Sequence, residues 1–462
     1  MKNKIKILEL KILLVIMEIF LLLLICTLLK LVFHPRETEK NDEVKQTILE
    51  LSEIEKQIND TETIQCPMPG TSEAPFIGDF SAYDKIRVVI TNKENGSIFH
   101  ENAEEWKDRK DYRGVFEIFE EEAGDVVVNE LSIEEYLYSV VPSEMPASYP
   151  LEALKAQAIC ARTYAYLHIM SPGYPKYNAH VDDTTAYQVY HNIEEQETTT
   201  LAVNETIGKI LLAPDGNEPA QTYYYSTSCG YGSDAHVWRT KYSDAYPYIR
   251  ARHINKTCQG NCSLNEEELQ AYFENVNQED YEVKEPWYRW SYRVEDLNTE
   301  HMFMVLQKRH EVMPDLILTK KGDDFISQPI KKFKKVKDIR IIKREAGGVA
   351  DEMLIVTEKQ TIKVITELNI RYVLNDGCSK VVRQDGSSVD MGTLLPSAFM
   401  CLEVLKNKND VYGYNITGGG YGHGAGMSQN AAKVMAAQGM NAEEIIKFFF
   451  GDCKIHVVEN RE

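Results

Sequence analysis

The sequence predicts an α+β protein: a membrane-anchored extracellular mixed α/β domain with a sheet core, a long helix, and a second α/β lobe. Two observations predict this class. Apolar residues make up 43% of the 462 residues, and 26 Tyr and 15 Phe are among the aromatics, so the chain can bury extensive cores. Segments that alternate like strands are also interspersed with segments of helical periodicity.

The charge and the cysteines exclude two broad classes. The chain carries 71 Asp and Glu against 51 Lys and Arg, a formal net charge of −20, so we expect no nucleic-acid partner. Nine scattered cysteines are too few for a small disulfide scaffold. Cys258 and Cys262 in CQGNC can pair, stay free, or hold a metal with His253; a local disulfide or free thiols are favoured over the metal.

An apolar segment near the N-terminus predicts a membrane anchor. Residues 12–29 read ILLVIMEIFLLLLICTLL and, with Val32 and Phe33, approach the roughly 20 residues that span a bilayer. No small-x-small cleavage site follows, so an uncleaved anchor over 12–33 is favoured over a signal peptide. Lysines before the span and acidic residues after it place the N-terminus in the cytoplasm and the rest outside the cell membrane.

The next segments predict a stalk and then a sheet. From Val44 apolar residues recur at three- and four-residue steps, and a Pro/Gly/Ser-rich stretch follows, so we expect a helical stalk and linker over 34–80. IRVVITN and VFEIFEE then alternate like half-buried strands, and DVVVNEL is a shorter one.

A long helix is predicted from Pro150 by PLEALKAQAICARTYAYLHIM, which has Pro in its first turn. Two stripes with the same spacing run along it. One is made of small residues suited to close packing, and the other would present two cations and a phenol along one side, either as a solvated face or toward a ligand. The first stripe is made of Leu154, Ala158, Ala161 and Ala165. The second is made of Lys155, Ile159, Arg162 and Tyr166.

The pattern changes at about residue 265 and predicts a second α/β lobe over 265–395. NEEELQAYFENV indicates a helix, and EPWYRWSYRV, KDIRIIKRE, EMLIVTE and TIKVITEL indicate strands. A glycine-dense stretch, TGGGYGHGAGMSQNAAKVMAAQGM, follows the lobe, and AEEIIKFFFGD then predicts a short amphipathic helix.

One carboxyl group is a candidate general acid. In SVVPSEMPASYP, Glu144 lies between two prolines in a predicted turn, flanked by Val141 and Met145. Apolar walls raise the pKa of a carboxyl group, and a Glu that stays protonated near neutral pH can protonate a leaving oxygen, as in glycosidases. The structural alternative is a solvated residue or a charge at a helix entry.

Two further clusters carry polar and aromatic groups. GGGYGHGAGMSQ fits no phosphate-binding template, and its His423 is a candidate base, ligand or plain loop histidine. QTYYYSTSCGYG interleaves rings with hydroxyls, as a sugar-binding groove requires, although an aromatic core would look the same. The sequence has no H-E-x-x-H or G-x-S-x-G motif, so metalloprotease and acyl-transfer functions have no specific support.

Taken in this order, the three clusters resemble the stage II sporulation protein D / amidase-enhancer family of bacterial cell-wall proteins. The matching segments are IEEYLYSVVPSEMPASYPLEALKAQAICARTYA, then YYSTSCG with PYIRA, then GGGYGHGAGMSQNAAKVMAAQGMNAEEIIKFFFGD. TTAYQVYHN, AGGVADEMLIVTE and NIRYVLN also follow the family's order, so the resemblance spans roughly residues 128 to 456.

The resemblance implies a peptidoglycan lytic transglycosylase that acts on glycan strands without stem peptides and needs no cofactor. Glu144 falls on the family's acid/base position, and Lys155 and Arg162 fall on needed positions of the catalytic helix. Glu144 would protonate the glycosidic oxygen and then, as a carboxylate, help the muramoyl 6-hydroxyl attack its own anomeric carbon.

The resemblance also guides the predicted substrate contacts. Removing the stem peptide leaves a lactyl carboxylate on muramic acid, which we expect Lys155 or Arg162 to bind. Some clostridial members carry metal ligands just before the QVY segment, but this chain has Asp182, Ala186 and Tyr187 there, so no metal is expected. The other residues predicted at the groove are Tyr225, Ser228, Tyr421 and His423.

Two other functions stay open at this point. One is a non-catalytic wall-binding activator of a peptidoglycan amidase, and the other is a scaffold in a membrane complex. The expected partners are glycan strands, the membrane, a peptidoglycan amidase and membrane proteins of an engulfment complex, with sporulation implied by the resemblance alone. The predicted divisions are a cytoplasmic tail (1–11), the anchor (12–33), the stalk and linker (34–80), a first catalytic segment (81–264), the second lobe (265–395), and a second catalytic segment with the Gly-rich loop (396–462).

Overall fold

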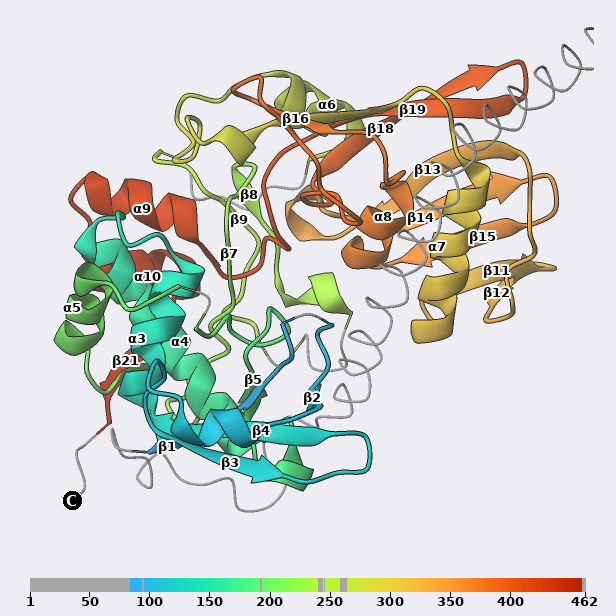
Figure 1. Cartoon of the computed structure of the whole chain (residues 1–462). Helices are drawn as coiled ribbons and strands as arrows, with labels where there is room; N and C mark the ends of the chain where they lie inside the picture. Colours follow the sequence, from blue (N-terminus) through green and yellow to red (C-terminus); the bar gives the residue numbers. More distant parts are fainter. Residues whose placement is uncertain are drawn as a thin grey trace, which may run out of the picture. The chain divides into compact units, whose positions relative to one another are not determined.

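Figure 1 shows the computed structural model, which describes residues 84–458 except 94, 192, 240–243, 245 and 258–263. The predicted tail, anchor, stalk and linker, and both cysteines of CQGNC, lie outside these residues. Within the described part of the chain, no helix combines the length and the apolar character needed to cross a membrane.

The described chain begins with a mostly antiparallel sheet. Its strands are β1 (Lys85–Ile90), β2 (Phe99–His100), β3 (Val115–Phe119), β4 (Asp125–Ser132) and β5 (Val181–Asp182). β4 pairs with β3 along one edge and with β1 and β2 along the other, and β5 extends β1 in parallel. Alternation along β4 sends Val128 to a small cluster on one face and Val127 to the main core on the other. The three strands predicted here are confirmed.

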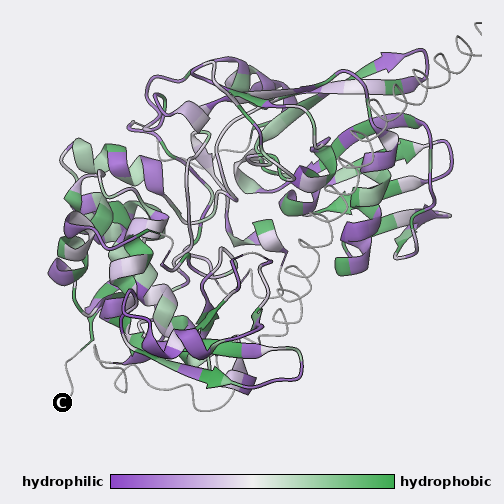
Figure 2. Ribbon diagram, viewed as in Figure 1, coloured by the Kyte–Doolittle hydropathy of each residue, from purple (hydrophilic) through white to green (hydrophobic). Residues whose placement is uncertain are grey.

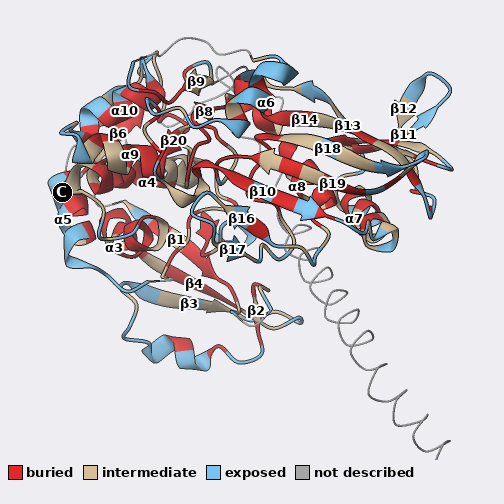
Figure 3. Ribbon diagram, turned by 90° about the horizontal axis from the view of Figure 1, so that it is seen from above, coloured by how far each residue is buried: buried red, intermediate tan, exposed pale blue. Residues whose placement is uncertain are grey.

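Helices from both ends of the chain surround one central helix. They are α3 (Ile133–Glu144), α4 (Leu151–Met170), α5 (Glu197–Glu205), α9 (Gln429–Ala437) and α10 (Ala442–Phe450). α4 packs against the other four, and Figure 3 colours most of it as buried. The helix and its close-packed stripe are confirmed, but the second stripe is not a solvated face, because only Lys155 of it is partly exposed. Arg162 and Tyr166 are 0% exposed, and Ile159 is 1% exposed.

A larger sheet forms the second lobe. Its strands are β10 (Trp290–Val294), β11 (Ile317–Lys321), β12 (Asp324–Ile326), β13 (Val336–Arg344), β14 (Ala350–Thr357), β15 (Thr361–Ile365), β16 (Val381–Arg383), β17 (Ser388–Val389), β18 (Met400–Asn407) and β19 (Asp410–Gly418). The path is β12-β11-β15-β14-β13-β19-β10-β16-β17, with β18 on β19. The sheet therefore continues beyond residue 395, where the second lobe was expected to end.

Helices cover this sheet. α7 (Thr299–Val312) and α8 (Glu367–Leu374) pack on β11, β14 and β15, whereas α6 (Glu266–Glu274) packs on β18 and β19. TIKVITEL is a strand only as far as Ile365, because Glu367 already begins α8. Short 3-10 turns lie at Glu104–Asp108, Pro175–Tyr177, Ala235–Trp238, Pro286–Tyr288 and Ala346–Gly348.

Short strand pairs join segments that are far apart in the sequence. They are β7 (Tyr224–Tyr225) with β20 (Met427–Ser428), β8 (Tyr231–Gly232) with β9 (Arg252–His253), and β6 (Lys209–Leu212) with β21 (Lys454–Val457). The β7–β20 pair places the end of the Gly-rich loop beside the tyrosine-rich segment. Figure 2 shows hydrophobic residues in the helices around α4 and in both sheets.

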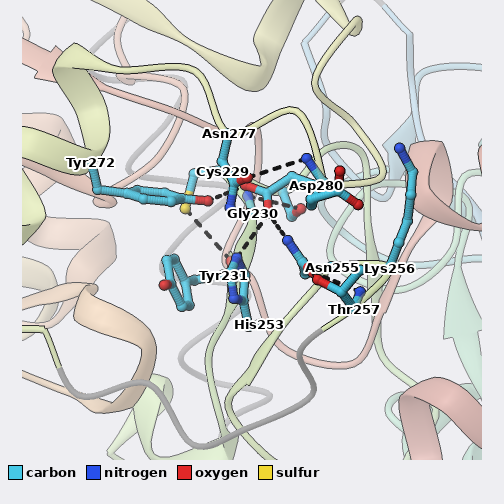
Figure 4. Close-up of polar contacts among 12 residues, drawn as sticks. Cys229, Gly230, Tyr231, His253, Asn255, Lys256, Thr257, Tyr272, Asn277 and Asp280 are labelled. Carbon is cyan, nitrogen blue, oxygen red and sulfur yellow. Dashed lines mark hydrogen bonds and ion pairs between the residues drawn. The ribbon is translucent and has the colours of Figure 1, made fainter.

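A single buried carboxylate ties the segment around β9 to the second lobe (Figure 4). Asp280 is 0% exposed and accepts hydrogen bonds from side chains of two separate segments. Burial opposes its ionisation, but these hydrogen bonds outweigh burial and lower the pKa of Asp280. The donors are His253 Nε2 and Asn255 Nδ2 at 2.8 Å, Tyr288 at 2.7 Å, Asn277 Nδ2 at 3.2 Å, and the Tyr272 hydroxyl.

Candidate active site

Glu144 is the last residue of α3, not part of a turn as the two prolines had predicted. The helix begins at Ile133, after the N-cap residue Ser132, which forms a capping box with Glu135, and it continues through Pro142. A proline removes only one N–H, so the last helical turn tolerates Pro142 and ends two residues later. This end of the helix carries a partial negative charge, which disfavours a carboxylate there.

The surroundings of Glu144 favour the neutral acid. The residue is partly exposed, yet burial of its carboxyl group raises the pKa to about 7. Hydrogen bonds from the Val189 N–H, 2.7 Å from Oε1, and from the Tyr224 hydroxyl oppose this shift but are weaker. No Lys or Arg of the described chain pairs with Glu144. The raised pKa expected from apolar walls is therefore confirmed.

Gln188 holds the partners of Glu144 in place. Its Nε2 donates to the Tyr224 hydroxyl at 3.1 Å and to the Ala161 carbonyl of α4 at 3.3 Å. Its Oε1 accepts from the Tyr136 hydroxyl of α3 at 3.4 Å. Since Gln188 is buried, this amide fixes the position of Tyr224 relative to the two helices.

The end of the Gly-rich loop reaches the same place. Gln429, the first residue of α9, donates from Nε2 to the Glu144 carbonyl at 3.1 Å and to Gln157 Oε1 at 3.4 Å. Asn430 donates from Nδ2 to Thr227 Oγ1 at 2.8 Å and accepts from the Tyr149 hydroxyl at 2.6 Å. The first and last sequence clusters therefore meet at Glu144.

The loop itself depends on glycine for its close approach. Gly426 has φ +81°, and a Cβ there would lie 2.0 Å from the Tyr223 carbonyl oxygen. An L side chain at this position would be strained and would also clash with backbone. Glycine is thus required where the loop passes the tyrosine-rich segment.

His423 is a neutral histidine in an aromatic setting. Its ring lies 5.1 Å from Trp238 and 5.7 Å from Tyr225. Burial lowers its pKa to about 4, so it is uncharged at neutral pH. The Ala425 N–H donates to Nδ1 at 3.2 Å, which assigns the proton to Nε2. His423 therefore supplies no positive charge, and its ring also makes a hydrogen bond with the backbone of Tyr224.

The other predicted groove residues differ in accessibility. Tyr421 is 36% exposed and lies 5.0 Å from Trp287, ring to ring, so it can meet a ligand. Tyr225 is 5% exposed and Ser228 2%, so both belong to the interior. Along β7 the side chains alternate, and Tyr224, not Tyr225, is the one beside Glu144. Contacts of Tyr225 and Ser228 with a glycan stay predictions.

Ser228 binds a second buried carboxyl group, Glu282, which the sequence analysis did not identify. The Ser228 N–H donates to Oε1 at 2.9 Å, the Ser228 hydroxyl donates to Oε2, and the Ser428 hydroxyl donates to Oε1 at 2.7 Å. Burial raises the pKa of Glu282 to about 8. This carboxyl group is 1% exposed and links the tyrosine-rich segment to β20 from inside.

The two predicted cations of α4 have protein partners. Arg162 is fully buried and makes a bidentate contact with Glu134 of α3 at 2.8 and 2.7 Å. Lys155 pairs with Glu152 at 2.7 Å and with Glu205 of α5 at 3.1 Å. Both therefore join α4 to its neighbours, and the predicted binding of a substrate carboxylate by either stays a prediction.

The segment before QVY makes hydrogen bonds within the protein. Asp182 accepts from the Tyr174 hydroxyl at 2.7 Å, and from the N–H and hydroxyl of Thr184 at 2.8 and 2.7 Å. Ala186 and Tyr187 follow in the same loop. Among the described residues, no group of three His, Cys, Asp or Glu side chains is arranged to hold a metal ion.

Besides Glu282, sequence reasoning missed three side chains around Glu144: Gln188, Tyr224 and Gln429. Each lies in a quoted segment, QVY, YYY or MSQ, but no local pattern singles out one residue in it. The strand alternation at Tyr224–Tyr225 was the available signal, and it could not be used without knowing which face of the strand meets α3.

Fold and site together define an α+β protein with one candidate general acid beside an aromatic, Gly-rich loop. Residues 121–212 match the profile of the family described as Stage II sporulation protein, and residues 234–426 match a domain of unknown function. The family model and the curated relatives support the stage II sporulation protein D / amidase-enhancer family, as the motifs predicted.

Three curated relatives show the extent of the similarity. The Amidase enhancer of Bacillus subtilis is 28% identical over 317 residues, which cover 68% of this chain and 39% of the relative. Stage II sporulation protein D of Bacillus amyloliquefaciens is 27% identical over 338 residues, covering 70% and 74%. Stage II sporulation protein D of Bacillus subtilis is 39% identical over 139 residues, covering 27% and 39%. The chain thus spans well under half of the Amidase enhancer.

Proposed function

We propose that this protein is a membrane-anchored peptidoglycan lytic transglycosylase. It cleaves stem-peptide-free glycan strands between muramoyl and glucosaminyl residues and leaves 1,6-anhydro-muramoyl ends. The observation that carries the proposal is the carboxyl group of Glu144, whose pKa is raised by burial to about 7 at the family's acid/base position. Such a group can hold a proton at neutral pH and release it to a leaving oxygen.

The proposed reaction needs one carboxyl group. Glu144 donates its proton to the glycosidic oxygen while the bond from that oxygen to the muramoyl anomeric carbon breaks. The muramoyl 6-hydroxyl oxygen then bonds to the same carbon, and its proton returns to the Glu144 carboxylate. No water is consumed, and the nucleophile is already part of the substrate, so its attack is intramolecular.

The neighbours of Glu144 suit this double role. The Val189 N–H and the Tyr224 hydroxyl both donate toward the carboxyl group, so they stabilise the carboxylate that forms after proton transfer. Burial works in the opposite direction and keeps the resting group protonated. The two effects together hold the pKa near neutrality, where one group can serve as acid and then as base.

The test is digestion of purified peptide-free glycan strands by the full chain in detergent, with products identified by mass spectrometry. Anhydro-muramoyl ends are expected from the wild type and not from Glu144→Gln, which keeps the shape of the side chain but cannot give up a carboxyl proton. Glu267→Gln, at an exposed position of α6, is the matched control and should cleave like the wild type. Equal cleavage by Glu144→Gln would refute the proposed acid.

A second candidate is a non-catalytic activator of a peptidoglycan amidase. The relative named Amidase enhancer, aligned over 68% of this chain, favours it. Mixing the protein with a purified peptidoglycan amidase and intact wall separates the two functions. Stimulated peptide release by both wild type and Glu144→Gln, with no anhydro ends from either, would establish the activator and exclude the transglycosylase.

We further propose the cellular setting implied by the N-terminal segment and by the family's name. The anchor at 12–33 holds the protein in the cell membrane with the N-terminus in the cytoplasm, so the described domain reaches wall close to that membrane. Wall remodelling during sporulation engulfment is the process this arrangement fits. Protease added to intact protoplasts should degrade the domain but spare the residues before the anchor.

A further inference from the structure

A cavity of about 450 Å³ lies between α10 and the chain segment around β9. Its volume is within the range of about 300–1,000 Å³ that is usual for small-molecule sites. Cations, two aromatic rings and two carboxylates line it. The lining residues are Tyr248, Arg250, Ala251, Arg252, His253, Met440, Glu444, Lys447, Phe448, Gly451 and Asp452.

Arg252 is the central cation of this cavity. Its side chain is mostly covered, lies 5.7 Å from the Phe448 ring, and donates from Nε to the Arg250 carbonyl at 3.4 Å. Among the described residues no carboxylate pairs with it, and burial lowers the pKa of the guanidinium to about 10. A covered charge without a counter-charge is costly, and an anion in the cavity would remove that cost.

The other charged groups leave the cavity with an excess of positive charge. Arg250 pairs with Asp452 at 3.4 Å, and Glu444 accepts the Asn441 N–H at 2.9 Å in the capping box of α10. Both carboxylates of the lining are thus engaged. Lys447 has no ion pair within the described chain, so Lys447 and Arg252 are both available to an anion.

The cavity is separate from the Glu144 site. Tyr224 and Tyr225 are consecutive residues of β7, so their side chains point to opposite sides of the strand. Tyr224 lies beside Glu144, whereas Tyr225 interacts electrostatically with Arg252. A ligand in the cavity would therefore sit behind β7 and would not occupy the place of the scissile bond.

We infer that this cavity binds a carboxylate group of peptidoglycan, with Arg252 as a bidentate partner and Lys447 as a second cation. The planar guanidinium matches the two oxygens of a carboxylate, and Phe448 offers an apolar surface to the rest of the ligand. The choice of peptidoglycan as the source rests on the proposed function. The carboxylate has two sources there: the lactyl group of peptide-free muramic acid, or a stem peptide.

The experiment is calorimetric titration of the full chain in detergent with four probes. N-acetylmuramic acid carries the lactyl carboxylate, and N-acetylglucosamine is the matched sugar without it. An Ala–Glu dipeptide represents the stem, and inorganic phosphate represents a plain anion. We expect one or both carboxylate probes to bind and N-acetylglucosamine not to bind. The probe that binds identifies the source.

Variants connect the binding to the cavity. Arg252→Gln and Lys447→Gln should each weaken carboxylate binding at least tenfold, while Arg293→Gln, at an exposed position of β10, should not change it. The carboxylate affinity of Arg252→Lys should lie between those of the wild type and of Arg252→Gln, because lysine keeps the charge but loses the bidentate contact. Lys447 is exposed, so its variant tests the proposal even where an Arg252 variant fails to fold.

Besides the absence of any carboxylate binding, two results would overturn the inference. One is carboxylate binding that neither Arg252→Gln nor Lys447→Gln affects. The other is phosphate binding as tight as the carboxylates, which would mark a plain anion site. The test is independent of cleavage, since Glu144→Gln should bind the carboxylate probes like the wild type. If the wild type forms anhydro-muramoyl ends but binds no carboxylate probe, this inference alone is rejected. If it binds a carboxylate probe in the cavity but forms no anhydro-muramoyl ends, the transglycosylase alone is rejected.

Discussion

Glu144 stands at a helix end, desolvated and without a cation beside it, and these three conditions decide when it holds its proton. A carboxyl group with an ordinary pKa would be ionised at neutral pH and could not protonate a leaving oxygen. Burial is the larger influence here, and the hydrogen bonds from Val189 and Tyr224 limit the shift. The proposed chemistry therefore has a definite pH dependence.

Cleavage should fall as the pH rises through about 7, because the acid form of Glu144 is then lost. Initial rates of anhydro-end formation, measured at a series of pH values around 7, determine this decrease. Tyr224→Phe removes a hydrogen bond that lowers the pKa of Glu144, so the cleavage rate of this variant should fall at a higher pH than that of the wild type. A rate that stays constant or increases above neutrality would contradict the role of Glu144 as the acid.

The same pKa affects stability. The folded protein keeps the Glu144 proton up to about pH 7, whereas the unfolded chain releases it near the ordinary value of 4.5. The folded state thus binds more protons between these values, and stability falls as the pH rises through this window. Glu144→Gln lacks this penalty and should be more stable than the wild type at pH 8, by about 1–3 kcal/mol. Denaturant unfolding of both proteins at pH 4 and pH 8 measures the difference, which should largely disappear at pH 4.

α4 is the element that most changes the interpretation of the sequence. Its spacing predicted a basic face, yet helices from residues 133 to 450 enclose it, and Arg162 became an interior residue. The Arg162–Glu134 contact joins α4 to α3, whose last residue is Glu144. Arg162 thus acts as a positioning residue in this structure.

Arg162→Ala should destabilise the protein by about 3–5 kcal/mol, because it leaves Glu134 buried without its partner. Arg162→Lys should cost less, since it keeps a charge but loses the bidentate geometry. Thermal unfolding measures both. The change in KM for glycan strands separates this role from substrate binding: a raised KM in a variant of unchanged stability would show that Arg162 contacts the substrate.

Over the whole molecule, Asp280 links the segment around β9 to the second lobe. Its pKa is lowered from 3.8, so its contribution to stability is present above that value and is lost as the pH falls through it toward the folded pKa. Asp280→Asn should lower stability at neutral pH by about 2–4 kcal/mol. On acidification this variant should lose less stability than the wild type does. Denaturant unfolding at pH 7 and pH 3 measures both effects. Asp323→Asn, on an exposed turn, is the control and should behave like the wild type.

Local pattern was enough for several elements of this protein. The strands β1, β3 and β4 and the helices α4, α6 and α10 follow from their periodicity, because alternation and helical spacing are properties of neighbouring residues. The motifs likewise indicated the family and singled out Glu144. α3 was missed because Pro142 looks like the end of a helix, although the helix continues to Glu144 and packs against α4 and α5.

The partners of Glu144 depended on tertiary structure. Val189 and Tyr224 are distant from it in sequence, and their positions follow from Gln188, which contacts α3, α4 and β7 together. Which tyrosine faces the carboxyl group, and whether Arg162 meets solvent or Glu134, depends on which surfaces the packed helices leave open. Short-range spacing specifies the elements and the chemistry they carry, but burial and long-range pairing decide which groups meet, and hence where each proton is held.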